Sequence, residues 1–270
     1  MTEPLLEVEG LSKRFGGVAA VAGASFGVAA GSITSLIGPN GAGKTTVFNL
    51  ISGFIKPDRG VVRFAGRSIA HLSGDAVARA GMVRAFQAPR VLTRMSVLDN
   101  MLLAGKDQPG EILGLNLVQP ARVKERERHI RIKAAELLEL LRLSHLSGAY
   151  AGTLSGGQRK LLELGRALMV EPRMILLDEP MAGIAPVLGE QLLEHIRWLR
   201  ADRGMTVCVI EHDMDVVMTI SDRVIVMEDG QVIAAGEPTA IQQDERVIEA
   251  YLGRSAPRSR SVSDGPEKRP

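Results

Sequence analysis

Cysteine is nearly absent from this 270-residue chain, and neither sign of charge is in excess. The one cysteine, Cys208, can form no internal disulfide and cannot supply a thiolate metal site, so zinc modules are excluded and a reducing compartment is expected. Lys and Arg number 33 against 31 Asp and Glu, a net charge of +2 that is too small for a dedicated nucleic-acid clamp. We therefore expect no nucleic acid among the partners.

Charge is also missing between Arg14 and Lys44, a gap long enough to resemble a membrane span. The segment consists of glycine and alanine rather than leucine and isoleucine, so its transfer into lipid and its helix propensity are both poor. The first nine residues lack the basic region and apolar core of a signal peptide. We expect a globular protein with a sizeable core, whose contact with any membrane is peripheral.

Hydrophobic periodicity predicts an α/β fold. The pair Asp229-Gly230 is typical of a type I′ turn and predicts a hairpin between the last two strands. The predicted strands are 6–9, 33–37, 61–64, 174–177, 206–210, 224–227 and 232–235. The period is helical from 96 to 143, apart from a Gly/Pro loop at 105–120, so we expect a helical insert over about 88–165. Residues 254–270 are rich in Ser, Pro and Arg and are predicted to be a disordered tail.

A phosphate-binding loop pattern, G-x-x-x-x-G-K-[ST], follows the strand predicted at 33–37 and precedes a predicted helix. Glycines in this context let several backbone N–H groups face one centre at the positive end of a helix. Lys44 is expected to reach the β- and γ-phosphates of a nucleotide, and the Thr45 hydroxyl is expected to bind Mg²⁺. The predicted nucleotide-binding residues are Gly38, Pro39, Asn40, Gly41, Ala42, Gly43, Lys44, Thr45 and Thr46.

Two acids follow the apolar strand predicted at 174–177. A parallel α/β sheet places its ligands at the carboxyl ends of the strands, so Asp178 is the candidate carboxylate for Mg²⁺. The next side chain, Glu179, points elsewhere in an extended chain and is the candidate general base that polarises water for attack on the γ-phosphate.

A second phosphate-binding geometry is predicted at residues 154–158, Leu-Ser-Gly-Gly-Gln, which precede a strongly helical run. The order of the loop at 38–45, this segment and the acids at 178–179 resembles the ATP-binding cassette (ABC) family over roughly residues 5–253. The resemblance implies a P-loop NTPase core with an antiparallel β subdomain and an α-helical insert. It also implies that Ser155, Gly156, Gly157 and Gln158 bind ATP held by another subunit.

Three further roles are implied by the resemblance alone. Gln87 matches the glutamine that touches Mg²⁺ and relays the nucleotide state to membrane subunits. His212 matches the switch histidine that contacts the γ-phosphate, and Phe15 matches the aromatic residue that stacks on adenine. One stretch departs from the family pattern S-A-L-D, because its acid is missing and the coupling between two sites is therefore in doubt. That stretch is Ala182, Gly183, Ile184 and Ala185.

Within the family, the sequences around Phe15, Gln87 and His212 resemble the ATPases of branched-chain amino acid importers. The resemblance implies a head-to-tail dimer with a sister chain or with itself, transmembrane permease subunits and an extracytoplasmic substrate-binding protein. It also implies a peripheral position on the cytoplasmic face of the plasma (inner) membrane. The ATPase does not touch the solute, so urea, amides, other amino acids and lipopolysaccharide export stay open as alternatives. A chromosome-associated ATPase and a regulatory module that binds ATP without hydrolysis are the competing function classes.

Overall fold

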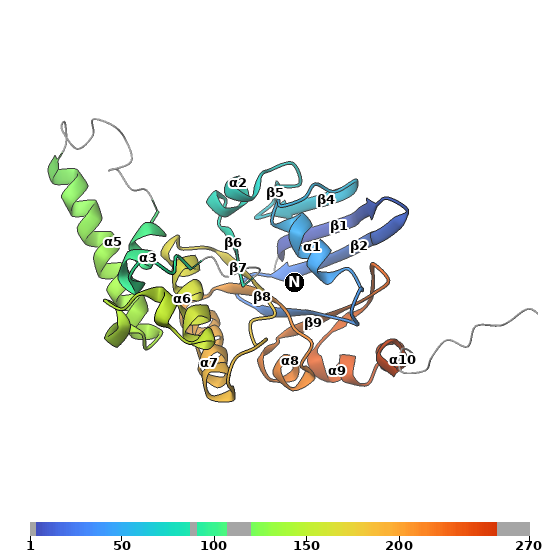
Figure 1. Cartoon of the computed structure of the whole chain (residues 1–270). Coiled ribbons are helices and arrows are strands. Elements are labelled where there is room, and N and C mark those ends of the chain that lie inside the picture. Colours follow the sequence, from blue (N-terminus) through green and yellow to red (C-terminus); the bar gives the residue numbers. More distant parts are fainter. Residues whose placement is uncertain (1–3, 87–90, 107–119, 253–270) are drawn as a thin grey trace, which may run out of the picture.

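The computed structural model describes residues 4–86, 91–106 and 120–252 and contains two sheets with helices around them (Figure 1). The first sheet is antiparallel, has four strands and runs in the order β2-β1-β4-β5. Its strands are β1 (Pro4–Phe15), β2 (Val18–Ala29), β4 (Arg59–Phe64) and β5 (Arg67–Ser68). The uncharged stretch after Arg14 therefore lies in strands rather than in a membrane span.

Strand β1 is longer than the four residues that alternation predicts. The pairing with β2 shifts register between Val8 and Leu11, and Gly10 has a φ of 59°. Such a bulge breaks the alternation of buried and exposed side chains while the strand continues. The sequence pattern therefore stops at Glu9, although the strand does not.

The second sheet has six strands in the order β10-β9-β3-β8-β7-β6. Its strands are β3 (Ile33–Ile37), β6 (Met82–Ala85), β7 (Met174–Asp178), β8 (Thr206–Ile210), β9 (Arg223–Glu228) and β10 (Gln231–Gly236). All pairs are parallel except β9 with β10, whose hairpin turn at Asp229 and Gly230 has φ values of 44° and 81°, as a type I′ turn requires. The predicted hairpin is confirmed, whereas β6 was not predicted.

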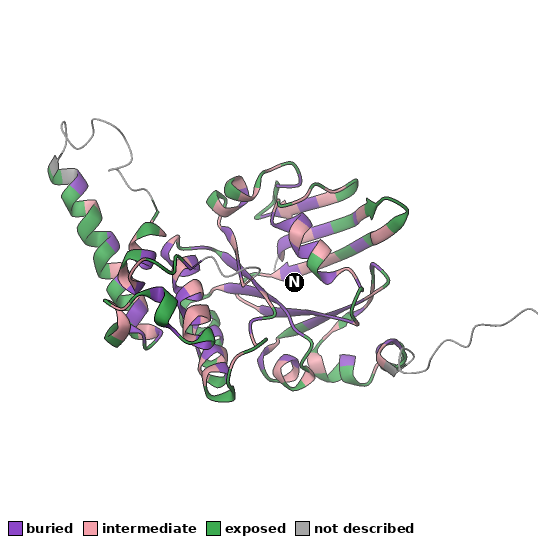
Figure 2. Cartoon of the chain, in the orientation of Figure 1, coloured by how far each residue is buried: buried purple, intermediate pink, exposed green. Residues whose placement is uncertain are grey.

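Helices cover this sheet and extend to one side of it (Figure 1). The elements close to the two sheets are α1 (Lys44–Ile51), α2 (Gly74–Arg79), α7 (Pro186–Arg203), α8 (Met214–Ile220), α9 (Pro238–Gln242) and α10 (Glu245–Leu252). The lateral group is α3 (Val97–Leu103), α5 (Pro120–Leu140), η2 (Ser144–Leu146), η3 (Ala151–Thr153) and α6 (Gly156–Met169). The central strands β3, β7 and β8 are buried almost completely, whereas much of α5 is exposed (Figure 2).

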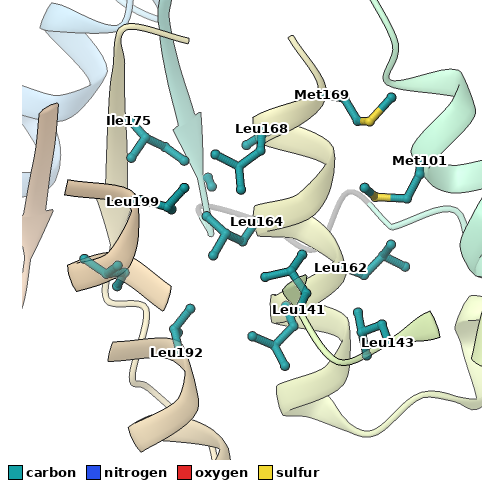
Figure 3. Packing of buried hydrophobic residues seen from close by; sticks show 14 of the residues in the cluster. Met101, Leu141, Leu143, Leu162, Leu164, Leu168, Met169, Ile175, Leu192 and Leu199 are labelled. Atoms are coloured by element: carbon teal, nitrogen blue, oxygen red, sulfur yellow. The ribbon is translucent and has the colours of Figure 1, made fainter. Parts of the chain in front are cut away.

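Helix α6 connects the lateral helices to the sheet. Leu164 and Leu168 face Ile175 of β7, and Leu162 on the other side lies toward Met101 of α3 (Figure 3). Replacing a buried leucine such as Leu164 with alanine typically costs about 2–5 kcal/mol, so this packing fixes α6 firmly against β7. Within the described ranges, no helix combines the length and the apolar character that a membrane span requires.

Candidate active site

The carboxyl ends of four parallel strands form one edge of the six-stranded sheet. Leu36 of β3 and Asp178 of β7 both pair with Ile210 of β8, and Leu177 pairs with Ala85 of β6. Asp178 therefore lies two strands from Leu36, or about 10 Å at the usual spacing between strands. The loop after β3, the acids after β7 and the residues after β8 consequently meet at this edge.

At two glycines of the loop at 38–45, the surrounding backbone leaves no space for a side chain. A Cβ atom on Gly38 (φ 143°) would lie 2.0 Å from the carbonyl oxygen of Met227. A Cβ atom on Gly43 (φ 97°) would lie 2.3 Å from the carbonyl oxygen of Ala20. The hairpin turn supports the same loop, since the N–H of Gly230 donates to the carbonyl of Ala42 at 3.1 Å. Strands β2 and β9 thus set the shape of the loop.

Helix α1 begins at Lys44 behind Gly43, and no side chain caps its N-terminus. The Lys44 ammonium is nearly buried and donates to the carbonyl oxygens of Gly38 at 2.6 Å and Pro39 at 3.0 Å. Thr45 is exposed and Thr46 is half-buried at the start of the helix. A helix N-terminus and a fixed ammonium form a positive cradle that fits a polyphosphate.

Asp178 is held by an arginine from the neighbouring strand. One guanidinium nitrogen of Arg84 lies 2.5 Å from Asp178 Oδ2, and the other donates to Asn49 Oδ1 of α1 at 2.6 Å. The rings of Phe48 and Phe54 each lie 5.7 Å from the guanidinium carbon. The Arg84 side chain is 3% exposed, so this buried ion pair holds the Asp178 carboxylate in one orientation.

Glu179 follows in the left-handed region, with a φ of 49°. Its N–H donates to the carbonyl oxygen of Ile210 at 3.0 Å, and its residue is exposed. Lys160 of α6 donates to three carbonyl oxygens of the turn that begins here, at Glu179 (3.2 Å), Pro180 (2.8 Å) and Ala182 (2.7 Å). Glycine adopts this conformation freely, whereas a residue with a Cβ atom does so at a steric cost, so the surrounding contacts hold Glu179 there.

The residues after β8 present one buried and one exposed side chain. Glu211 is fully buried and accepts the N–H of Met181 at 3.0 Å and that of His212 at 3.3 Å. Burial raises the pKa of the Glu211 carboxyl, and these two N–H groups oppose the rise. The side chain of His212 is 63% exposed and is free to meet a ligand at the sheet edge.

Helix α6 begins with a capping box at residues 155–158. The N–H of Gln158 donates to Ser155 Oγ at 3.2 Å, and the N–H of Ser155 donates to Gln158 Oε1 at 2.9 Å. Ser155 and Gly156 are exposed, whereas Gly157 is buried. This helix N-terminus is therefore presented at the surface.

The comparisons with known proteins agree with this geometry. The family model described as "ABC transporter" matches residues 21–182, and a second, "Branched-chain amino acid ATP-binding cassette transporter", matches residues 231–257. The chain is 42% identical over 253 residues to the "High-affinity branched-chain amino acid transport ATP-binding protein BraF" of Pseudomonas aeruginosa, covering 94% of this chain and 99% of that protein. The chain belongs to the ABC transporter family.

Other members of the ABC transporter family give the same result. The LivG protein of Escherichia coli strain K12, also described as a high-affinity branched-chain amino acid transport ATP-binding protein, is 40% identical over 94% of this chain and 99% of its own length. The ADP conformation of MJ1267, a solved ATP-binding cassette of an ABC transporter, superposes with a TM-score of 0.80 at 42% identity, over 93% of this chain and 100% of that chain. The predicted fold class is confirmed, and this protein is an ABC transporter ATPase.

The described contacts do not test the roles predicted for two of the site residues, Phe15 and Gln87. Phe15 is 51% exposed at the end of β1, where the Lys13 ammonium lies 5.8 Å from its ring centre. Gln87 lies outside the described residues. The predicted roles of these two residues in an ABC transporter ATPase stay predictions.

Three charged residues of this ABC transporter ATPase were missed by the sequence analysis: Arg84, Lys160 and Glu211. Each binds a group far away in the sequence, which no short motif records. The position of Glu211 could have indicated its role, because it directly follows the five buried residues of β8. Burial lowers the pKa of the Lys160 ammonium, although Glu211 and nearby glutamates oppose the change.

Proposed function

We propose that this ABC transporter ATPase hydrolyses ATP with Mg²⁺ to power the import of branched-chain amino acids. The observation that carries the proposal is the common register of β3, β8 and β7, which brings the loop at 38–45, Asp178, Glu179 and His212 to one edge. The descriptions of BraF and LivG and the second family match support the solute class.

Each part of the edge has a place in this chemistry. The positive cradle of residues 38–46 binds the phosphates of ATP, and Lys44 neutralises their charge. Thr45 and Asp178 would hold Mg²⁺ together with Gln87, and the ion would screen the charge of the phosphate oxygens. Among the described residues, no three His, Cys, Asp or Glu side chains form a metal cluster, which fits an ion held largely by its substrate and water.

Glu179 acts as the general base. Its exposed carboxylate accepts a proton from the water that attacks the γ-phosphate, and His212 contacts that phosphate from the end of β8. Phe15 stacks on the adenine. Because the N-terminus of α6 is presented at the surface, Ser155, Gly156, Gly157 and Gln158 bind an ATP held by a second subunit in a head-to-tail dimer.

The proposed assembly places the chain on the cytoplasmic face of the membrane. Its second ATPase subunit is either another copy or a sister chain, and permease subunits receive the motion of the dimer. An extracytoplasmic binding protein delivers the solute to the permeases. Importers of urea, amides or other amino acids and lipopolysaccharide exporters are the alternatives.

Replacement of Glu179 with Gln tests the enzymatic step. The variant keeps size and hydrogen bonding but loses basicity, so phosphate release with Mg-ATP should fall by about 10² to 10⁴, the usual effect of removing a general base. ATP binding should persist, and size-exclusion chromatography should show a dimer trapped with ATP, with the sister chain added if this chain does not self-associate. Glu190→Gln, an exposed glutamate of α7, is the matched control. Hydrolysis at the normal rate by Glu179→Gln would refute the assigned base.

The solute is tested separately, by uptake of isotope-labelled leucine, isoleucine and valine in a strain that lacks this chain. Uptake should fall and should return with the normal chain but not with Glu179→Gln. Unchanged leucine uptake combined with reduced uptake of urea, amides or another amino acid would replace the proposed solute and leave the ATPase assignment intact.

A further inference from the structure

Lys160 of α6 donates hydrogen bonds to the turn that contains Glu179, the proposed base. Lys160 lies two residues beyond Gln158, on the first turns of α6. An ammonium has three donors, and the three carbonyl oxygens of Glu179, Pro180 and Ala182 lie within 3.2 Å of Nζ. The donor capacity of Lys160 is therefore matched by the turn that follows β7.

Glu211 holds the same turn through one of the turn's N–H groups. Its buried carboxylate accepts the N–H of Met181, which lies between the carbonyl groups that Lys160 binds. The other carboxylate oxygen accepts the N–H of His212. Lys160 donates to the carbonyl groups and Glu211 accepts from the N–H group, so the two side chains together fix the turn of residues 179–182.

The same face of α6 also reaches the end of β6. Glu163, one turn after Lys160, accepts the N–H of Phe86 at 3.0 Å, and the Lys160 ammonium lies 5.7 Å from the Phe86 ring centre. Phe86 has a φ of 73°. Helix α6 therefore contacts the exits of both β6 and β7, and its leucines leave it little freedom to move independently of β7.

We propose that Lys160 and Glu211 are positioning residues for Glu179, and that Lys160 transmits the position of the α6 N-terminus to the catalytic base of its own chain. The inference rests on the proposed function. In a head-to-tail dimer, one end of α6 would meet the partner's ATP while Lys160 holds the base for the chain's own ATP. This link runs from the Lys160 ammonium to backbone carbonyl oxygens and does not need the acid that is missing at Ala185.

Lys160→Met is the direct test, because methionine fills similar space without a charge. The residues of the turn are unchanged, but their carbonyl groups lose the three hydrogen bonds from Lys160, so Glu179 leaves its position. The kcat for ATP hydrolysis should fall at least tenfold, a modest part of the effect of a missing general base. The KM for ATP should change less than about threefold, because the cradle of residues 38–46 is untouched.

A double variant separates positioning from a general loss of structure. Once Glu179 is Gln, there is no base to place, so adding Lys160→Met should lower the residual hydrolysis by less than about threefold. Lys133→Met is the matched control, since Lys133 also donates to a helix-end carbonyl, that of Met169, but lies away from the site. That control should keep normal kcat and KM.

Glu211→Gln provides an independent variant that keeps the shape of the side chain. It should lower kcat by about fivefold, the rate effect of one ordinary hydrogen bond, again with an unchanged KM. The inference would be overturned by a normal kcat in both Lys160→Met and Glu211→Gln. It would also be overturned if Lys160→Met lowered kcat by the same factor with and without Glu179→Gln. If Glu179→Gln itself is inactive, the proposed function stands in either case. A fully active Glu179→Gln would overturn both.

Discussion

The two helices proposed to point at nucleotide phosphates, α1 and α6, begin in different ways. Helix α1 follows Gly43 in a left-handed conformation and has no side-chain cap. Helix α6 follows Ser155 and closes its first turn with a reciprocal capping box to Gln158. The second helix end is thus completed by side chains of its own chain, whereas no side chain caps the first.

This difference has an energetic meaning. The first N–H groups of a helix have no partner within the helix, and here a nearly buried ammonium lies beside them, so α1 is suited to tight binding of an anion by a single chain. A capped helix end is stable without a ligand and gains less from one. We therefore expect α1 to determine nucleotide affinity and α6 to determine association with a second subunit.

The largest expected effect is that of Gly43→Ala. A Cβ atom there would lie 2.3 Å from the carbonyl oxygen of Ala20, so the loop at 38–45 must deform. Equilibrium dialysis should show nucleotide affinity at least about 100-fold weaker, which corresponds to a loss of about 2.7 kcal/mol of binding free energy.

Gly156→Ala is the matched control for that variant. The nearest atom to its added Cβ lies 3.9 Å away, at the carbonyl oxygen of Gly183, and the helix begins with ordinary backbone angles there. Nucleotide affinity of the single chain should therefore be unchanged. Equal losses in the two glycine variants would contradict the distinction between the helix ends.

Lys44→Ala should come next in size. It removes the ammonium that faces the cradle, and hydrogen bonds to charged groups are worth about 1.5–3 kcal/mol, or roughly 10- to 150-fold in affinity. Combined with Glu179→Gln, it should also abolish the dimer trapped with ATP, which size-exclusion chromatography would show. A trapped dimer that persists without Lys44 would contradict the role of α1.

Ser155→Ala should have a smaller effect of another kind. Loss of this cap should lower the free energy of unfolding by about 1 kcal/mol in chemical denaturation. Nucleotide affinity of the single chain should not change, but the Glu179→Gln dimer should form less readily. Ser155→Thr keeps the capping oxygen and serves as the control. A weaker single-chain affinity in Ser155→Ala would show that α6 binds nucleotide within its own chain.

The smallest effect is expected from truncation after Gly253. The predicted tail at 254–270 lies outside the described residues, and its sequence lacks apolar anchors. Both helix ends should work without it, so ATP affinity and turnover should stay within about twofold of normal. A tenfold loss would mean that the tail contributes to one of the two ends.

Local chemistry explains what could be predicted from the sequence. The loop at 38–45, the Ser155 cap and the Asp229-Gly230 turn each depend on residues that are neighbours in the chain, and their types are restricted by backbone angles. The structure has the predicted helix start at 155–158, which Ser155 caps, and the predicted turn, and it places the loop between β3 and α1. The β strands with continuous apolar runs were also found, because burial on both faces leaves a clear pattern.

Tertiary contacts explain what could not be predicted. Strand β6 has only four residues and contains Arg84, whose charge is accommodated by Asp178 and Asn49 far away in the sequence. Lys160 looks like an ordinary surface residue of a helix until the carbonyl groups after β7 lie against it. Among the apolar residues near 91–98, the structure buries Val91 and Val97 in the core but leaves Leu92 40% exposed, a difference that only tertiary contacts decide.

The place of β3 in the sheet has a consequence for synthesis. This strand lies between β8 and β9, and Ile33 exchanges hydrogen bonds with Asp222 through its N–H and carbonyl groups. Residue 227 leaves the ribosome roughly 190 residues after residue 37, about 10–40 s later at usual translation rates. Until β8 and then β9 emerge, β3 lacks its two neighbours, and the phosphate loop lacks the part of its support that β9 supplies. We therefore expect the phosphate loop to reach its final shape late in synthesis, and the apolar strand β3 to stay without its partners during that interval.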